Sequence, residues 1–315
     1  MLENKNNLRI LFMGTPHFSA EILSVLLAQK YNIYGVFTQP DKKVGRKQLL
    51  EKSPVKILAE ENNIPVFTPH KLDAENIAHI QKMSPDLIVL VAYGKILPQA
   101  VLDLPRLGAV NIHPSLLPKF RGPSPIQNAL LDGEKITGTT IMLMDAGMDT
   151  GDILKQETIE IHPDEIYFEL EEKLIQLSSR LLLEVLPDLI DQKIVPQKQD
   201  DSKVTYCRLI KKNDGQIDWH DSAEMIYNKY RAFAKWPGIF SYVNGKRIKL
   251  NKIDLAPSEK SNHQPGEVFK AGDAVCVQAT DGAIRLEEVQ LEGKPNMKIS
   301  EFLNGQRDFV GSVLE

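Results

Sequence analysis

The 315-residue sequence contains only two cysteines, Cys207 and Cys276. Two such distant cysteines are too few for a disulfide framework and lack the close spacing of a metal-binding motif. No apolar run approaches the roughly 20 residues that a membrane-spanning helix needs. The first seven residues are polar and lack the apolar core of a secretory signal. We therefore expect a cytoplasmic protein with no membrane partner and no metal.

The sequence also lacks a dinucleotide-binding fingerprint. Its first apolar stretch, residues 8–13, ends at a single Gly14, whereas close approach to a pyrophosphate needs the G-x-G-x-x-G pattern. This argues against a nicotinamide cofactor. The formal net charge of −4 gives no general reason to expect a nucleic acid, so that partner has to be argued from local patches.

What is present is the pattern of an α/β protein. Residues 8–13, 19–29 and 33–37 read as strand, helix and strand, which predicts a parallel sheet. The continuous apolar run at 86–92 predicts a central strand covered on both faces. Helices are expected at 55–62, 74–82, 125–131 and 165–190. The fold class predicted for this part is a Rossmann-like, mostly parallel sheet.

The pattern changes beyond residue 204. A helix over 222–233 precedes short strands, with a hairpin turn at Asn244-Gly245, and this combination predicts a compact β-barrel. The polar stretch 191–203 reads as a linker. We therefore predict domains at 1–190 and 204–315, joined by residues 191–203. The expected strands lie at 239–243, 246–250, 266–269, 275–278 and 283–286.

A candidate reactive site lies at the end of the strand predicted over 109–113. Strand alternation places Ala109, Asn111 and His113 on one face, so an amide and an imidazole point the same way. In the loop that follows, Lys119 and Arg121 are expected to bring two cations to the rim of the site. The strand therefore offers a hydrogen-bond donor and an acid/base group to one side of the sheet.

Asp149 is the candidate third member. It lies in the Gly-containing turn 145–152, after a strand predicted at 136–144. Beside Asn111 and His113, its carboxylate would supply an orienting anion. Each residue also has an ordinary structural explanation, namely a strand-end amide, a half-buried histidine and an Asp-Gly turn. The residue pattern alone leaves both explanations open.

A resemblance shifts this balance. The motif Asn-Ile-His-Pro-Ser-Leu-Leu-Pro-Lys-Phe-Arg-Gly at 111–122, followed by Asp-Ala-Gly-Met-Asp-Thr-Gly-Asp at 145–152, resembles the signature of the folate-dependent formyltransferases. The resemblance implies 10-formyltetrahydrofolate as formyl donor, and Asn111, His113 and Asp149 as catalytic residues. It also implies a folate site at Ser115, Leu116, Leu117 and Pro118 and at the strand end Ala92, Tyr93 and Gly94. The sequence departs from the family pattern at Pro114 and at 123–125.

The basic stretch 38–54 is a candidate contact for RNA. Charge pattern alone favours a solvated surface insertion, but the stretch resembles the loop with which the tRNA-acting members of the family grip an acceptor stem. Lys42 stands where an arginine is common in the family, so the charge is kept without the bidentate fork. Residues 231–238 resemble the start of the family's OB-like carboxyl-terminal domain. The candidate tRNA-contacting residues are Lys42, Lys43, Arg46, Lys47 and Lys52.

Taken together, the resemblance implies transfer of a formyl group to methionine carried on the initiator tRNA, for translation initiation, by a protein that we expect to be a monomer. One alternative keeps the amino-terminal domain with a different acceptor: a small amine such as glycinamide ribonucleotide or an amino sugar, or water in a formyltetrahydrofolate hydrolase. Another is a non-catalytic RNA-binding protein. The basic loop and the barrel favour tRNA, and the intact Asn111, His113 and Asp149 argue against a loss of catalysis.

Overall fold

The computed structural model describes residues 8–44, 48–256 and 262–315. The chain forms two compact units. The first consists of Met1–Pro125, Ile136–Glu160 and Glu171–Arg208, and the second of Ile126–Lys135, Ile161–Leu170 and Leu209–Glu315. Two short segments from within the predicted amino-terminal domain thus group with the second unit. The functional boundaries at 1–190, 191–203 and 204–315 stay a prediction.

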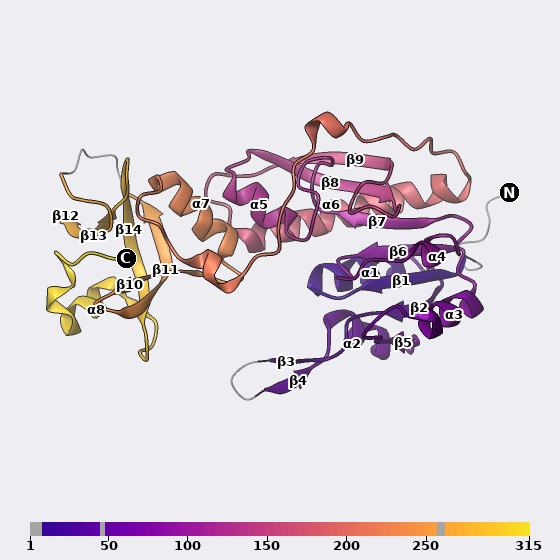
Figure 1. The fold of residues 1–315 in the computed structure, drawn as a ribbon, viewed down its shortest axis with the longest axis horizontal. Helices are drawn as coiled ribbons and strands as arrows, with labels where there is room; N and C mark the ends of the chain where they lie inside the picture. The colour runs from indigo at the N-terminus through magenta and orange to yellow at the C-terminus, as the bar shows by residue number, and fades with distance from the viewer. Residues whose placement is uncertain (1–7, 45–47, 257–261) are drawn as a thin grey trace. The chain divides into compact units, whose positions relative to one another are not determined.

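The first unit is built on a seven-stranded sheet, ordered β5-β2-β1-β6-β7-β8-β9 in Figure 1. The first five strands in this order pair in parallel, and β8 and β9 add antiparallel pairs at one edge. The prediction of a mostly parallel, Rossmann-like sheet is therefore confirmed. The strands are β1 (Ile10–Gly14), β2 (Ile33–Phe37), β5 (Val66–Phe67), β6 (Leu87–Val91), β7 (Ala109–His113), β8 (Ile136–Leu143) and β9 (Ile153–Glu160).

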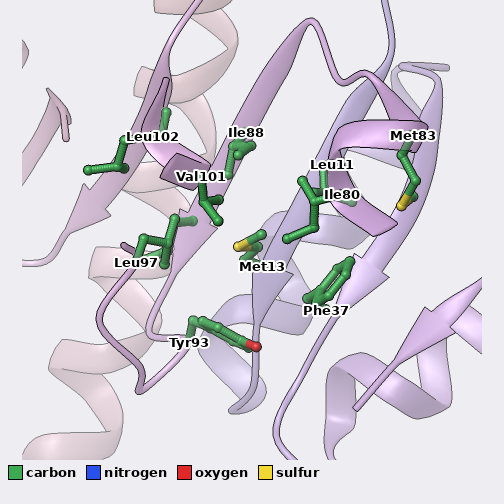
Figure 2. Packing of buried hydrophobic residues seen from close by; sticks show 12 residues of the cluster. Leu11, Met13, Phe37, Ile80, Met83, Ile88, Tyr93, Leu97, Val101 and Leu102 are labelled. Atoms are coloured by element: carbon green, nitrogen blue, oxygen red, sulfur yellow. The ribbon is translucent and has the colours of Figure 1, made fainter. Parts of the chain in front are cut away.

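Helices cover this sheet because its central strands are apolar on both faces. Leu11 and Met13 of β1 belong to one buried cluster with Ile80 and Met83 of a helix on one face, and Figure 2 shows part of this cluster. The alternate residues of β1 are also fully buried, as expected for a central parallel strand. The helices of this unit are α1 (His17–Ala28), α2 (Pro54–Glu61), α3 (Ala74–Met83), α4 (Gln99–Leu102) and most of α6 (Tyr167–Ile190), whereas α5 (Pro125–Leu131) groups almost entirely with the second unit.

Local sequence signals explain where several helices begin. Ser53 and Asp73 accept hydrogen bonds from the backbone N–H groups of Lys56 and Asn76, and so cap α2 and α3. Pro54 occupies the first helical position of α2, where its missing N–H costs nothing. The predicted helices at 55–62, 74–82 and 165–190 therefore agree with α2, α3 and α6 to within two residues at each end. No helix in the described ranges is long and apolar enough to cross a membrane.

The second unit carries an antiparallel sheet, ordered β10-β11-β14-β13-β12, with β15 paired to β14. Asn244 and Gly245 both have positive φ, 50° and 72°, as the predicted tight hairpin turn requires. Ser222 caps α7, which begins at the next residue. The antiparallel β domain is confirmed, and closure into an OB-like barrel stays a prediction. The elements are α7 (Ala223–Phe233), β10 (Ile239–Val243), β11 (Lys246–Leu255), β12 (Val268–Ala271), β13 (Ala274–Gln278), β14 (Ala283–Leu291), β15 (Met297–Lys298) and α8 (Ile299–Gly305).

The basic stretch was expected to be a loop, and the structure instead shows a two-stranded antiparallel hairpin within it. Strands β3 (Lys42–Val44) and β4 (Leu49–Glu51) pair so that Lys42 lies opposite Glu51. In Figure 1 this hairpin projects away from the seven-stranded sheet of its own unit. Charged residues in place of a clear alternation hid the strands from sequence analysis.

Candidate active site

The candidate catalytic residues gather where β6 and β7 end. These strands are parallel neighbours, with Leu90 paired to Asn111, so their carboxyl ends lie at the same edge of the sheet. Open α/β sheets bind ligands at that edge. Asn111 and His113 alternate along β7, and they are only 6% and 5% exposed. The side chains therefore face a confined environment rather than bulk water.

Asp149 reaches these two residues from the loop after β8. Its Oδ1 accepts a hydrogen bond from Asn111 Nδ2 at 3.3 Å, and its Oδ2 lies 3.8 Å from His113 Nδ1. The backbone N–H of Gly122 donates to Oδ2 at 2.8 Å. The predicted juxtaposition of amide, imidazole and carboxylate is thus present.

The loop that carries Asp149 is tightly folded. Asp149 has a φ of 56°, in the left-handed region that Asp tolerates better than most residues. A Cβ at Gly151 would lie 1.7 Å from the Leu143 carbonyl oxygen, so only glycine fits there. The turn is consequently held close against the end of β8, which fixes the position of the carboxylate.

The imidazole of His113 is oriented by a contact that the sequence did not predict. Its Nε2 lies 3.0 Å from the carbonyl oxygen of Phe120. A carbonyl only accepts, so Nε2 carries the hydrogen and Nδ1 of the neutral ring is the free base. Nδ1 is also the nitrogen nearer Asp149, at a distance that suits charge stabilisation better than a hydrogen bond. The Phe120 carbonyl therefore also orients this ring, and the role expected of Asp149 as its orienting anion stays a prediction.

The predicted folate loop is a rigid segment beside these residues. Ser115 and Leu117 are buried, Leu116 and Pro118 are half-buried, and the Leu117–Pro118 peptide is cis. Thr140 Oγ1 donates to the Ser115 carbonyl and accepts from the Leu117 N–H, at 2.7 and 3.1 Å. The loop is therefore fixed to β8 through its backbone.

The predicted folate contacts at the end of β6 divide into buried and exposed groups. Ala92 and Gly94 are exposed and have positive φ values of 45° and 78°. Tyr93 is fully buried in the core of Figure 2, where burial raises the pKa of its phenol to about 12. Its carbonyl accepts from Thr15 Oγ1 and Gln39 Nε2, both at 3.1 Å. Ala92 and Gly94 are thus the exposed residues at this edge, and the Gly94 carbonyl already accepts from Gln39 Nε2 at 3.1 Å.

Of the candidate tRNA-contacting residues, those that the structure describes lie on the β3–β4 hairpin or directly beside it. Lys42 and Lys43 are exposed, and Lys52 forms an ion pair with Glu60 at 2.7 Å. Burial, followed by the charge of Lys42, lowers the pKa of Lys95. Among the described residues, the hairpin lysines make no hydrogen bond or ion pair with the catalytic candidates. Arg46 and Lys47 lie outside the described residues.

One prediction about the site is wrong. Arg121 was expected to bring a cation to the rim of the site, but its side chain is only 3% exposed. Its guanidinium donates to Gln199 Oε1 through Nε at 3.1 Å and through Nη2 at 2.7 Å. Gln199 lies in the stretch interpreted as a linker, 78 residues away, so no local pattern could have revealed the pair. Lys119 is exposed, as expected.

Within the described ranges, no group of three His, Cys, Asp or Glu side chains is arranged to hold a metal ion. The polar groups at the sheet edge are instead one amide, one imidazole, one carboxylate and several backbone N–H and carbonyl groups. Such a set can donate a hydrogen bond to a carbonyl oxygen and move a proton.

Comparison with known families matches both parts of the chain. Residues 8–186 match the family described as formyl transferase, and residues 209–307 match the formyl transferase carboxyl-terminal domain. The chain is 45% identical to the methionyl-tRNA formyltransferase of Caldicellulosiruptor saccharolyticus, with 97% of this chain and 99% of that protein covered. It is 43% identical to the enzyme of the same name from Geobacter sulfurreducens, with 98% and 96% covered.

Solved structures share the fold at lower identity. HypX from Aquifex aeolicus in complex with tetrahydrofolic acid aligns with a TM-score of 0.65 at 21% identity, over 96% of this chain and 48% of that one. This chain thus spans about half the length of HypX. The N-formyltransferase from Helicobacter canadensis, solved with folinic acid and dTDP-3-aminofucose, aligns with a TM-score of 0.66 at 20% identity, over 89% and 98%. At these identities the similarity concerns the fold alone.

Proposed function

We propose that this chain, which belongs to the formyl transferase family, transfers the formyl group of 10-formyltetrahydrofolate to the amino group of methionine on the initiator tRNA. The observation that carries this proposal is the 40–45% identity to methionyl-tRNA formyltransferases over nearly the whole chain. The level of identity matters because the N-formyltransferase solved with dTDP-3-aminofucose also shares the fold over 89% of this chain, but at only 20% identity. The product, N-formylmethionyl-tRNA, serves translation initiation.

The carboxyl edge of the parallel sheet suits the folate donor. Exposed backbone at Ala92 and Gly94 offers hydrogen-bonding groups to a flat heteroaromatic ring, next to the end of β7, which carries Asn111 and His113. The half-buried Leu116 and Pro118 add apolar surface. Bound here, 10-formyltetrahydrofolate supplies a formyl group on a nitrogen that can leave.

Asn111 is assigned to stabilise negative charge on the formyl oxygen. A side-chain amide carries two N–H donors, and among the described residues one acceptor, Asp149 Oδ1, contacts its nitrogen. The second N–H remains for the substrate oxygen. A preorganised donor in a site shielded from water contributes more in the transition state than it would in solution.

His113 is assigned to accept the proton of the attacking amine at Nδ1 and to return it to the folate nitrogen. The Nε2–H bond to the Phe120 carbonyl keeps this tautomer in place. Once Nδ1 is protonated, the ring is a cation 3.8 Å from the Asp149 carboxylate. Asp149 Oδ2 therefore stabilises the protonated His113 ring during the reaction. Asp149 Oδ1 meanwhile accepts the hydrogen bond from the Asn111 amide.

The β3–β4 hairpin supports tRNA as the acceptor over a small amine. It combines exposed cations, Lys42 and Lys43, with two leucines, Leu49 and Leu50, that are 66% and 69% exposed. Exposed lysines can contact the phosphates of a large polyanion, and exposed leucines can pack against its bases. A small acceptor would not need a hairpin of this kind. We further propose that the enzyme acts in the cytoplasm as a monomer.

The test is a transfer assay with 10-formyltetrahydrofolate labelled at the formyl carbon. Purified protein is incubated with initiator Met-tRNA, uncharged tRNA, glycinamide ribonucleotide and an amino-sugar nucleotide, and each product is separated. We expect label on Met-tRNA alone. The Asn111→Ala variant, purified in parallel, controls for host enzyme, because contaminating activity would persist in it.

Other outcomes would identify the alternatives. Label on a small amine would replace the acceptor, and release of labelled formate without an acceptor would indicate a hydrolase. Binding of tRNA with no transfer to any acceptor would indicate a non-catalytic RNA-binding protein. Each of these results contradicts the proposed function.

A further inference from the structure

The stretch 197–207, interpreted from sequence mainly as linker, lies against the candidate catalytic residues. Gln197 pairs with Ile153 of β9 through two backbone hydrogen bonds of 2.7 and 2.8 Å. Two residues later, Gln199 Nε2 donates to the carbonyl oxygens of Asp149 and Gly151, both at 2.8 Å. Both N–H groups of this side chain therefore hold the turn that presents the Asp149 carboxylate.

Arg121 fixes the orientation of the Gln199 amide. The guanidinium donates two hydrogen bonds to Gln199 Oε1, and its Nη2 also donates to Asp201 Oδ1 at 2.9 Å. If the Gln199 amide were rotated by 180°, its NH₂ group would face the N–H donors of Arg121. Only the orientation with Oε1 towards Arg121 allows these hydrogen bonds. Because Arg121 is itself buried, little water competes for these contacts.

The contacts close into a ring. Arg121 is followed by Gly122, whose N–H donates to the Asp149 carboxylate at 2.8 Å. One path thus runs from Arg121 through Gln199 to the Asp149 backbone, and the other from Arg121 through Gly122 to the Asp149 side chain. Together they hold the backbone and the side chain of Asp149. Its φ lies in the left-handed region, a conformation that costs free energy for a residue other than glycine.

The same stretch also supports His113. Thr205 Oγ1 accepts from the Phe120 N–H at 2.8 Å, and the Thr205 carbonyl accepts from the Arg121 N–H at 2.9 Å. These bonds hold the peptide whose carbonyl orients the imidazole. Two of the three catalytic candidates therefore depend on residues 199–205.

We propose that Gln199, anchored by Arg121, is a positioning residue that sets the Asp149 carboxylate against Asn111 and His113. It acts through Asp149 and does not contact the substrates. The effect on catalysis rests on the proposed function. Since misplacement of a reacting group by about 1 Å costs on the order of a hundredfold in rate, this support should be visible in turnover.

The first experiment measures kcat and KM for both substrates in the full-length enzyme. Gln199→Glu keeps the side-chain length and the acceptor for Arg121 but cannot donate to the Asp149 and Gly151 carbonyls. We expect kcat to fall roughly tenfold to a hundredfold, with both KM values little changed. Lys198→Ala, at the exposed neighbouring position, is the matched control and should retain wild-type kinetics.

A double-mutant cycle separates positioning from general loss of structure. If Gln199 acts through Asp149, then Gln199→Glu should cause little further loss in an enzyme that already carries Asp149→Asn. Multiplicative losses would overturn the proposal, and so would wild-type kcat in Gln199→Glu. Melting temperatures report whether each variant folds, and Gln199→Asn, a shorter amide, substitutes for Gln199→Glu if the latter is unfolded.

A second readout does not depend on the acceptor. The imidazole ¹⁵N resonances of His113, assigned by their loss in His113→Gln, should change in Gln199→Glu and in Asp149→Asn but not in Lys198→Ala. Unchanged resonances in Gln199→Glu would overturn the positioning role even if no transfer is found. Wild-type protein that formylates nothing but shows the expected spectral changes would instead contradict only the proposed function.

Discussion

The carboxyl edge of the parallel sheet and the β3–β4 hairpin belong to the same compact unit, but they present their polar groups in opposite ways. At the sheet edge, Asn111 and His113 are nearly buried, and every candidate catalytic group has a partner within 4 Å. On the hairpin, Lys42 and Lys43 are exposed, and the paired strands are only three residues long.

The difference follows from what each region has to do. A reacting group must be held in position before the substrate arrives, so its support has to be built into the fold. A polyanion is attracted over several ångströms by charge that need not be oriented. We therefore expect changes at the edge to lower kcat, and changes on the hairpin to raise the Kd for tRNA.

The largest effect is expected from Asn111→Ala. Loss of one preorganised donor costs on the order of a hundredfold to a thousandfold in turnover. The variant should fold and bind folate normally, because the structure gives the Asn111 side chain one hydrogen bond among the described residues. Single-turnover rates at saturating substrates measure the chemical step directly. Turnover near that of the wild type would remove Asn111 from the catalytic set.

Asp149→Asn sharpens the contrast further, since it keeps the size of the side chain, removes the charge and leaves only one of the two oxygens that accept from Asn111 and Gly122. The carboxamide no longer stabilises a protonated His113, so we expect a loss on the order of tenfold to a hundredfold in the chemical step. The Kd for the folate donor, measured by calorimetry, should be unchanged. A variant altered in folate affinity alone would make Asp149 a binding residue.

The matching change on the hairpin replaces Lys42, Lys43, Arg46 and Lys47 together by alanine. We expect the Kd for Met-tRNA to rise about tenfold at moderate salt. The negative slope of log K, the association constant, against log salt should become shallower by about 3, because fewer counterions are released. The kcat at saturating tRNA should persist. Parallel salt slopes at equal affinity would show that the hairpin is only a solvated insertion.

The smallest effect is expected from Tyr93→Phe, in the core under the sheet edge. The Tyr93 hydroxyl is buried and has no partner among the described residues, so its removal should raise the free energy of unfolding by about 1 kcal/mol. Urea unfolding at pH 7 measures this change, and a destabilised variant would show that the hydroxyl has a partner after all.

The same variant carries a pH signature. Burial raises the pKa of Tyr93 to about 12 from its usual 10, so the folded state retains the phenol proton where the unfolded chain has lost it. The associated stability is present below pH 10 and is lost as the pH rises through about 12. Tyr93→Phe should therefore lose less stability than the wild type over that interval, and identical losses would contradict the shift.

Several features of the fold could be predicted because they depend on neighbours along the chain. The apolar run of β6, the helix beginning near residue 222 and the Asn244-Gly245 turn are local signals with a direct physical cause. The β3–β4 hairpin was missed, since its strands are short and almost entirely polar or exposed.

The sequence by itself determined the chemical inventory of the site: an amide and an imidazole two residues apart on one strand, and a carboxylate on a glycine-containing turn. Only the tertiary structure decided how these groups are supported. In the folded chain Arg121 is buried, and the Phe120 carbonyl contacts and orients the His113 ring. Gln199 lies against the turn that carries Asp149. The physical reason is that periodicity and turn chemistry act over a few residues, whereas the Arg121–Gln199 contact joins positions 78 residues apart and exists only once the chain has closed on itself.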